Sequence, residues 1–543
     1  MSAAPTRIFM NTTVFTASPP YLGSPHADAF VVRDGKVAYA GDQKTAQRIA
    51  GSDAQVVDLG GALVLPGIVD AHVHVLLTGD VLGQADLQGI TDRAEVERRI
   101  LAWAKAHPDA PMVAPNGLLP VTVPTDRRER DWLDGLINDR PLLVSTSDLH
   151  SIFLNTQALA MLGIDRHTQA PAGGAIKRDA DGEPTGYVDE TALQQLVWPV
   201  LAGRSTEEDH DRHLAVALEA FRRHGITTVV EMGLEEHDLA AMRRAEARGE
   251  LTTRIVAHWV LAPLEDAATR LAQVDRAIEI AATQDSDRLR VTGIKVMIDG
   301  TVDGCTAALG RPYANGATPG PIWTLDMLAP VVAKADAAGL QVAMHAIGDE
   351  AVRIAVSAVE HAITVNGPRD RRHRIEHLEV VDKVDLERLA ALGISASMQP
   401  VHADPGIGDN WCAMLGDDRV ERGFPWPEVT DSGARLVFGT DTPTAPLHPL
   451  HNLYIAATRK SVMDPSRPPY LEHYAVPITD GIVHATYDAA WLCRGEGSFG
   501  SLTAGCQADF IVLDRDVLER PAAELLDAAV VRTYVSGEEV FAQ

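Results

Sequence analysis

One short pattern recurs through the middle of the chain: a stretch with helical apolar spacing, a glycine, and then an apolar strand. The helical stretches are 212–223, 327–338 and 384–392, and the glycines that follow them are Gly225, Gly339 and Gly393. A shorter segment ends in the same way at Gly433. Glycine commonly ends a helix because it adopts the left-handed conformation without strain. A buried strand directly after each glycine predicts parallel strands joined by helices.

Eight segments have the composition of buried strands. They are 63–74, 226–232, 254–261, 291–299, 340–345, 373–377, 394–399 and 436–441. Eight strands joined by helices predict an α/β fold of the (β/α)8 TIM-like barrel type, whose active sites lie at the carboxyl ends of the strands. An open, doubly wound parallel sheet is the alternative architecture for the same pattern.

The two ends of the chain and one long connection do not follow this pattern. Residues 1–62 and 500–543 have the character of short strands and turns, and we expect them to form one composite β-sandwich domain. The barrel is expected to span 63–499. The connection 80–205 is too long for a single link between two strands, so we predict an inserted subdomain after strand one.

Composition narrows the class of partner and the compartment. The formal net charge of -27 argues against nucleic acid or an anionic membrane as a partner, and its simplest interpretation is solubility. The four cysteines are widely spaced, without a Cys-x-x-Cys pair, which argues against a disulfide framework or a thiolate zinc site. Residues 1–7 lead into no apolar signal region, and no stretch approaches the length of a membrane span. We therefore expect a cytoplasmic protein.

His72 and His74 lie at the end of the first predicted strand. Residues i and i+2 of a strand project to the same side, so two imidazoles at this spacing form half of a site for a divalent metal. Other predicted strand ends carry further ligand types: Lys295 on the fourth strand, His345 on the fifth, His377 on the sixth and Asp441 on the eighth. Histidines and a carboxylate without sulfur suit zinc, manganese or iron, with zinc the first expectation.

Lys295 is one of only eight lysines and lies among apolar residues. A buried ammonium is costly and tends to lose its proton. A neutral lysine beside a metal can add carbon dioxide, which gives a carbamate whose two oxygens bridge two metal ions. Direct ligation or substrate contact is one alternative to the carbamate, and a structural lysine that reaches solvent or pairs with Asp299 is another.

Two segments resemble the metal-dependent amidohydrolase superfamily. Residues 65–74, Leu-Pro-Gly-Ile-Val-Asp-Ala-His-Val-His, resemble its opening motif, and residues 500–509 resemble its closing turn. The closing turn has Ala504 and Gln507 where the superfamily more often has proline and lysine. Both departures lie outside the predicted site.

Further segments resemble the amidohydrolase 3, or YtcJ-like, branch, which includes N-substituted formamide deformylase. They are Ser147–Ser151, Asn155–Leu159, Asp181–Gly186, Met344–Asp349 and Arg374–His377. The branch often has Gly-Trp in the insert, whereas Gly117 precedes Leu118 in this chain. The resemblance covers nearly the whole chain, and it implies a homodimer.

The resemblance also implies a division of the ligands between one or two divalent ions. His72, His74 and Asp441 would hold one ion, and His345 with His377 a second, bridged by Lys295 if it is carbamylated. A good zinc site lowers the pKa of bound water from 15.7 to roughly 7 and so supplies hydroxide. Asp441 would take the proton of the water and pass it to the leaving nitrogen.

Four residues around these ligands are expected to bind substrate or to orient the metal ligands. His150 resembles a histidine that faces the substrate in the family, and His402 follows the seventh predicted strand, so both are expected to bind substrate. Asp299 and Glu376 are expected to orient metal ligands through hydrogen bonds.

The function expected from these residues is hydrolysis of a non-peptide C–N bond, an amide or N-formyl group, in a small organic molecule. Deamination of a heterocycle is an alternative, and Lys295 counts against it because deaminases of this superfamily commonly lack that lysine. Ester or lactone hydrolysis stays open, since hydroxide attacks either carbonyl. A non-catalytic ligand-binding barrel predicts loss of the base, yet Asp441 is present.

Overall fold

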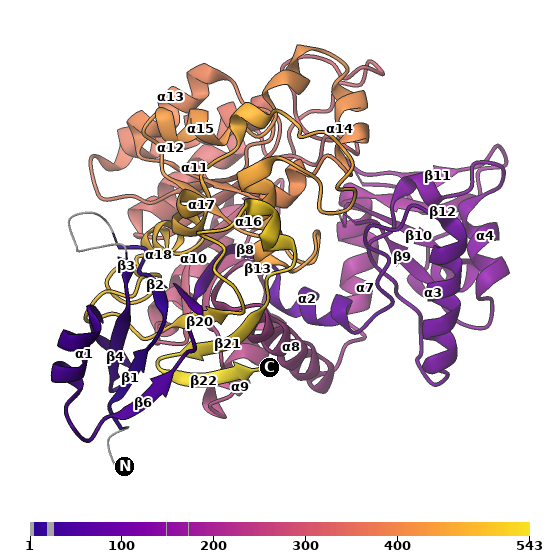
Figure 1. The fold of residues 1–543 in the computed structure, drawn as a ribbon. Helices are drawn as coiled ribbons and strands as arrows, with labels where there is room; N and C mark the ends of the chain where they lie inside the picture. Colours follow the sequence, from indigo (N-terminus) through magenta and orange to yellow (C-terminus); the bar gives the residue numbers. More distant parts are fainter. Residues whose placement is uncertain (1–4, 19–25, 148, 172) are drawn as a thin grey trace. The chain divides into compact units, whose positions relative to one another are not determined.

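The structure of the protein is a computed structural model that describes residues 5–18, 26–147, 149–171 and 173–543 (Figure 1). The chain divides into two compact units. The barrel unit comprises Met1–Val73, Leu218–Thr440 and Leu447–Gln543, and the insert unit comprises His74–Ala217 and Asp441–Pro446. Residues 1–4 of the opening segment, and Asp148 of the segment Ser147–Ser151, lie outside the described residues.

The barrel unit contains, within the described residues, a sheet of eight strands. Their spatial order is β19 (Leu436–Phe438), β18 (Ser395–Met398), β17 (Arg374–His377), β16 (Gln341–Ala346), β15 (Leu289–Met297), β14 (Arg254–Val260), β13 (Ile226–Leu234) and β8 (Ile68–Val73). Neighbouring strands are parallel throughout. The end strands β19 and β8 also contact each other. The predicted (β/α)8 barrel is confirmed, and the open doubly wound sheet is wrong.

Helices connect the strands. Those that follow β13 in the barrel unit are α9 (Glu236–Ala247), α10 (Ala267–Thr283), α11 (Leu325–Ala337), α12 (Asp349–Asn366), α13 (Lys383–Leu392), α14 (Gly408–Leu415), α15 (Trp426–Asp431), α16 (Pro449–Thr458), α17 (Ile478–His484) and α18 (Tyr487–Leu492). The four glycines predicted to follow helices have φ values of 75° at Gly225, 80° at Gly339, 67° at Gly393 and 90° at Gly433. All four are left-handed, which confirms the helix–glycine–strand pattern. None of the helices in the described part of the chain combines the length and apolar character of a membrane span.

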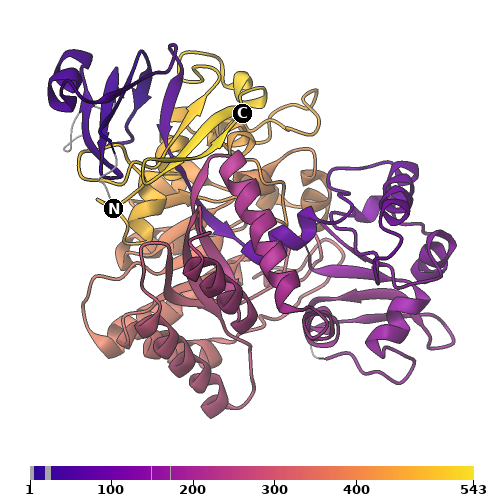
Figure 2. The ribbon, with the colours of Figure 1, turned by 90° about the horizontal axis from the view of Figure 1, so that it is seen from below.

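Strands from both ends of the chain lie side by side in the barrel unit, indigo and yellow in Figure 2. One sheet has the order β5 (Lys36–Gly41), β4 (Ala29–Arg33), β1 (Arg7–Met10), β6 (Gln55–Asp58), beside the helix α1 (Gln43–Ala50). The other, the terminal sheet, has the order β22 (Glu538–Ala542), β21 (Val530–Val535), β20 (Phe510–Leu513), β7 (Leu63–Pro66), β2 (Thr13–Phe15), β3 (His26–Ala27). The rings of Phe9 and Phe30 stack at 4.6 Å, and Phe510 meets Phe9 edge-on at 5.1 Å. The two ends of the chain therefore share one hydrophobic core.

The apolar run 63–74, expected as one strand, is two strands in different sheets. β7 pairs with β2 and β20 in the terminal sheet, whereas β8 pairs with β13 in the barrel. Gly67 separates them, and a Cβ at this position would lie 2.2 Å from the side chain of Thr227. The first barrel strand thus begins at Ile68 rather than at residue 63. The sequence does not indicate this boundary, because both strands are buried and therefore equally apolar.

The closing-turn motif has a structural role in the barrel unit. The carboxylate of Asp509 accepts a hydrogen bond from Arg254 Nε at 3.0 Å, and both side chains are buried. Arg254 is the first residue of β14, so the motif connects the terminal sheet to the amino-terminal end of the barrel.

The insert unit is built around a small sheet of its own, with the order β11 (Ile176–Arg178), β12 (Pro184–Asp189), β10 (Ser151–Leu154), β9 (Leu143–Ser145). Its helices include α2 (Val75–Leu82), α3 (Arg93–Ala106), α4 (Glu129–Leu136), α5 (Thr156–Leu162), α6 (Glu190–Ala192) and α7 (Trp198–Ala202), and α8 (Glu207–Arg223) starts within it. Two clusters of buried apolar side chains form its core, one around Trp132 and one around Leu159.

Candidate metal centre

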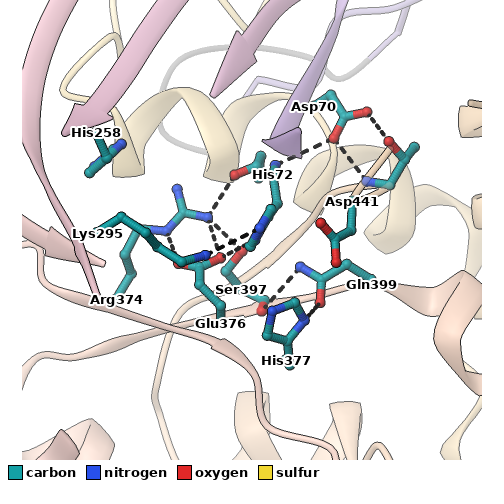
Figure 3. A network of polar contacts seen from close by, with 12 residues as sticks. Asp70, His72, His258, Lys295, Arg374, Glu376, His377, Ser397, Gln399 and Asp441 are labelled. Atoms are coloured by element: carbon teal, nitrogen blue, oxygen red, sulfur yellow. Dashed lines mark hydrogen bonds and ion pairs between the residues drawn. The ribbon is translucent and has the colours of Figure 1, made fainter. Parts of the chain in front are cut away.

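Four side chains with metal-binding or bridging chemistry meet at the carboxyl ends of the barrel strands. They are His72 of β8, Lys295 of β15, His345 of β16 and His377 of β17, with exposed fractions of 1%, 2%, 6% and 3%. The His377 ring centroid lies 5.0 Å from that of His72 and 4.4 Å from that of His345. Nζ of Lys295 lies 3.3 Å from Nε2 of His72 (Figure 3). Closure of the barrel brings these residues together from four strands.

His72 is oriented by a buried charged pair. Its Nδ1 donates a hydrogen bond to Glu376 Oε2 at 2.8 Å, and Arg374 donates to the same oxygen at 2.8 Å (Figure 3). Burial alone would raise the pKa of Glu376, but the charge of Arg374 and the hydrogen bond from His72 together hold it well below its usual value. The ionised Glu376 therefore fixes the proton of His72 on Nδ1, which leaves the lone pair on Nε2, the nitrogen beside Lys295.

His377 is oriented by an uncharged partner. Its Nδ1 donates to the amide oxygen of Gln399, the residue after β18, at 2.8 Å. His377 also adopts a φ of 78°, in the left-handed region. This conformation costs a non-glycine residue about 1–3 kcal/mol and persists only where the surroundings impose it. The hydrogen bond and the backbone conformation together aim Nε2 away from Gln399.

His345 lies beside a buried carboxylate. Its Nε2 is 3.7 Å from Asp299 Oδ1 and 3.3 Å from the carbonyl oxygen of Gly300. Asp299 accepts backbone hydrogen bonds from Ile347 at 3.0 Å and Gly348 at 2.8 Å. Burial raises the pKa of Asp299 to about 7, although these hydrogen bonds oppose the shift. Asp299 thus shapes the loop after β16 as well as facing His345.

Lys295 does not reach solvent. Its side chain is 2% exposed, which excludes the interpretation of a lysine that extends to the surface. Burial of a charged amine costs free energy, so Lys295 is held in this position at the expense of its hydration.

His74 and Asp441 form a second pair, within the insert unit. His74 Nε2 lies 3.5 Å from Asp441 Oδ1, and the backbone N–H of His74 donates to the carbonyl of Thr442 at 2.9 Å. Asp441 has a φ of 58°. Peptide bonds connect the pair to the barrel, since His74 follows Val73 of β8 and Asp441 follows Thr440.

Thr440 is itself fixed within the barrel unit. It donates to the carboxylate of Asp70, a residue of β8, from its backbone N–H at 2.8 Å and from its hydroxyl at 2.7 Å. These two hydrogen bonds fix the segment after β19 to β8, as far as Thr440, within the barrel unit.

The two residues expected to bind substrate lie in different units. His150 belongs to the insert unit, where its Nδ1 is 3.0 Å from Glu190 Oε2. His402 belongs to the barrel unit, where its ring stacks on that of His377 with centroids 5.7 Å apart and an interplanar angle of 14°. Its Nδ1 lies 3.5 Å from Glu379 Oε1. His402 thus borders the histidines at the strand ends.

Sequence reasoning missed three supporting residues. Arg374, with no exposed surface, also donates to the hydroxyl of Ser397 at 2.6 Å, and Gln399 and Asp70 were not assigned any role. A signal was present for the first, because an arginine two residues before Glu376 in a buried strand lies on the same face as that carboxylate. No comparable pattern marks Gln399 or Asp70, whose partners, His377 and Thr440, are distant from them in the sequence.

The donor set fits a divalent metal. Ligand nitrogens of His72 and His377 lie within 4.8 Å of each other. Imidazole nitrogens oriented by hydrogen bonds through their other nitrogen are the usual ligands of zinc and related metals. Carboxylate and imidazole ligands without thiolate suit zinc, manganese and iron alike.

Comparison with known proteins agrees with this chemistry. The model of the amidohydrolase family matches residues 55–541. The putative amidohydrolase YtcJ of Bacillus subtilis is 29% identical over 95% of this chain and 96% of its own length. N-substituted formamide deformylase of Arthrobacter pascens is 26% identical over 94% of each chain.

A solved structure has the same fold over almost the full length. The crystal structure of an uncharacterized metal-dependent hydrolase from Pyrococcus horikoshii superposes with a TM-score of 0.76 at 26% identity, and covers 95% of this chain and 99% of the other. The chain therefore belongs to the amidohydrolase family, as an enzyme of the class that hydrolyses carbon–nitrogen bonds other than peptide bonds.

Proposed function

We propose that the protein hydrolyses an amide or N-formyl group of a small organic molecule. The observation that carries the proposal is the meeting of His72, His345 and His377 with the buried Lys295 at the carboxyl end of the barrel. The similarity to a named formamide deformylase supports the choice of bond. Burial of these groups supports chemistry in a site from which bulk water is largely excluded, where charge interactions are strong.

The metal in this proposal is zinc, as one or two ions. His72, His74 and Asp441 would hold the first ion, and His345 and His377 the second. A bound divalent metal lowers the pKa of water towards neutrality and polarises a carbonyl oxygen. Glu376 and Gln399 keep their histidines in the tautomer with the lone pair on Nε2.

We propose a carbamate on Lys295 as the bridge between the two ions. Its neutral amine nitrogen attacks the carbon of carbon dioxide. The N–C bond forms as one C=O π bond breaks, its electron pair moves to oxygen, and the nitrogen releases one proton to solvent. The product carries two oxygens beside His72, whose Nε2 is 3.3 Å from the lysine Nζ. The burial of the amine supports this assignment, because burial disfavours the charged ammonium, which cannot attack carbon dioxide.

Asp441 is the proposed proton carrier. Its carboxylate removes a proton from the attacking water and then delivers it to the nitrogen that leaves. Its carboxylate lies 3.5 Å from Nε2 of His74, the histidine proposed to bind the same ion. Removal of this base lowers turnover without removing the histidine ligands of the barrel unit.

Metal analysis of purified protein with two variants tests the proposal. We expect bound zinc and turnover of N-substituted formamides by wild type, loss of turnover in Asp441→Asn, and loss of turnover with reduced metal content in Lys295→Ala. Lys334→Ala is the matched control, because Lys334 pairs with Asp275 on the outer helices. A ¹³C NMR signal for carbamate carbon should appear after labelling with ¹³C-bicarbonate and disappear in Lys295→Ala.

Two results would contradict parts of the proposal. Full metal content and turnover in Lys295→Ala would exclude the bridging carbamate. Turnover of an aminated heterocycle, with no hydrolysis of any amide or formamide by wild type, would replace the proposed function by deamination.

A further inference from the structure

A cavity of about 460 Å³ opens beside the candidate metal centre in the barrel unit. Its lining includes His402, Trp411, Cys412, Phe424, Arg467 and Tyr470. All of these residues lie within the barrel unit, so the cavity is a feature of this unit alone. Pockets for small organic ligands typically have volumes of about 300–1,000 Å³. The cavity is therefore large enough to hold a substantial part of a substrate.

Three aromatic side chains dominate one part of the lining. The Trp411 ring centroid lies 5.4 Å from that of Phe424 and 6.4 Å from that of Tyr470. Gly423 allows this arrangement, because a Cβ there would lie 2.7 Å from the Trp411 ring. Pro468 and Pro469 add rigid apolar surface beside the rings. A planar apolar group binds well among such walls, because aromatic rings gain from offset-stacked and edge-to-face packing in addition to the burial of area.

The charged groups of the lining neutralise each other. Arg467 donates to the carboxylate of Asp409 through both terminal nitrogens, and one of these nitrogens also donates to the carbonyl of Pro405. The guanidinium is thus engaged by the protein itself. A charged substituent on the ligand would gain no unpaired counter-charge from this pair, and it would lose its hydration on entry. The lining therefore favours an uncharged ligand group.

Glu379 connects the aromatic wall to the metal centre. Its buried carboxylate accepts a hydrogen bond from Trp411 Nε1 at 2.8 Å and lies 3.5 Å from Nδ1 of His402. His402 in turn stacks on His377. A ligand group held against Trp411 is thereby next to a histidine that contacts the proposed metal ligands.

We propose that this cavity binds an uncharged aromatic substituent of the substrate, next to the bond that is cut. The inference rests on the proposed amide or formamide hydrolysis at the same barrel end. It makes Trp411, Phe424 and Tyr470 specificity-determining residues. Neutral arylalkyl amides are then the preferred substrates over small alkyl amides and over arylalkyl amides that carry a carboxylate on the ring.

A protection experiment tests the cavity without measuring catalysis. Cys412 lines the cavity, whereas Cys305, also partly exposed, is not among the lining residues. The neutral probe 2-phenylethanol should slow alkylation of Cys412 by iodoacetamide in the full-length protein and leave Cys305 unaffected, as followed by mass spectrometry. The ring-carboxylated probe 4-(2-hydroxyethyl)benzoate should protect far less. Equal protection by both probes, or protection of neither cysteine, would overturn the proposal.

A kinetic experiment tests the link to the substrate. Cys412→Phe places a ring in the cavity, and it should raise KM for N-(2-phenylethyl)formamide about tenfold or more, as expected when an aromatic group loses its burial. KM for N-methylformamide and kcat for both substrates should change much less. Cys305→Phe, which introduces a ring at a cysteine that does not line the cavity, is the control. An equal KM increase for both formamides would contradict the assignment of the cavity.

The two experiments separate failure of the cavity from failure of the hydrolase proposal. Selective protection of Cys412 by the neutral probe in a protein that hydrolyses no amide would support the aromatic cavity and contradict the proposed reaction. Hydrolysis of formamides without selective protection would support the reaction and overturn the cavity.

Discussion

The barrel unit holds two groups of neighbouring histidines that differ in what orients them. At the strand ends, His72 donates to the carboxylate of Glu376 and His377 to the amide oxygen of Gln399. Away from the strand ends, His448 and His451 stack face to face with centroids 3.5 Å apart, and His224 meets His448 at 5.4 Å. We refer to His224, His448 and His451 as the stacked histidines.

The difference explains why proximity of histidines does not make a metal site. A ligand nitrogen must point at a common centre, and a hydrogen bond through the other nitrogen fixes that direction. Stacked rings present their faces to each other. Burial lowers the pKa of all three stacked histidines, and the charge of Arg223 adds to the lowering for His224. These rings are expected to stay neutral and without metal.

The largest expected effect separates the two groups by function. His72→Asn should lower bound metal and turnover by about a thousandfold in rate, of the order seen when a preorganised catalytic interaction is removed. His448→Asn should leave both nearly unchanged. Metal analysis and steady-state kinetics compare the two variants. Equal losses of metal and turnover in both would contradict the distinction between the strand-end histidines and the stacked histidines.

The next effect concerns the charged pair behind His72. Arg374→Met leaves the carboxylate of Glu376 buried without its cation, which should lower the free energy of unfolding by about 3–5 kcal/mol. Arg371→Met breaks a comparable buried pair with Asp336, away from the site. Denaturant unfolding should show a similar loss in both, whereas only Arg374→Met should also weaken metal binding. Unchanged metal binding in Arg374→Met would show that the pair serves stability alone.

A smaller effect is expected from the hydrogen bond to His72 itself. Glu376→Gln keeps the shape but removes the charge that fixes the tautomer, and it should weaken metal binding about 10–100-fold. Glu496→Gln, which alters a pair with Arg372 away from the strand ends, is the control. Competition with a chelator measures the affinities, and an equal affinity in wild type and Glu376→Gln would contradict orientation by the carboxylate.

The smallest effect is a pH dependence of the stacked histidines in metal-free protein. Burial, reinforced by the charges of His451 and His224, lowers the pKa of His448 from 6.5 to about 3. Well above pH 6.5 the His448 ring is neutral in both the folded and the unfolded state, so its titration does not change the free energy of unfolding. Below it, the unfolded state binds a proton that the folded state does not, so stability falls as pH decreases towards the folded pKa.

His448→Gln should make this decline shallower, by at most about 1.4 kcal/mol per pH unit. Urea unfolding of wild type and variant between pH 7 and about 4 measures the slope of the free energy of unfolding against pH for each protein. This pH range lies between the pKa of the ring in the unfolded state and its pKa in the folded state. Identical slopes would mean that the ring takes up its proton in the folded state.

Local sequence patterns predicted much of the fold. The helix–glycine–strand repeats could be recognised because a glycine after a helix and a buried strand are properties of short segments. The glycines of these repeats all adopt the expected left-handed conformation: Gly225, Gly339, Gly393 and Gly433. The boundary between two strands at Gly67 could not be predicted from the sequence. Both strands, Leu63–Pro66 and Ile68–Val73, are fully buried, and they differ only in the sheet that they join.

The sequence by itself determined which side chains lie at the carboxyl ends of the barrel strands. The two-residue period of a strand decides which side chains share a face, and the topology of the barrel brings the carboxyl ends of its strands together. The sequence alone therefore predicts that four side chains lie close together: His72, Lys295, His345 and His377. Only the tertiary structure decided that Arg374 and Gln399 support them, that Trp411, Phe424 and Tyr470 line one cavity, and that His448 stacks on His451. These contacts depend on the packing of side chains between separate strands, loops and helices, where distance along the sequence carries no information about distance in space.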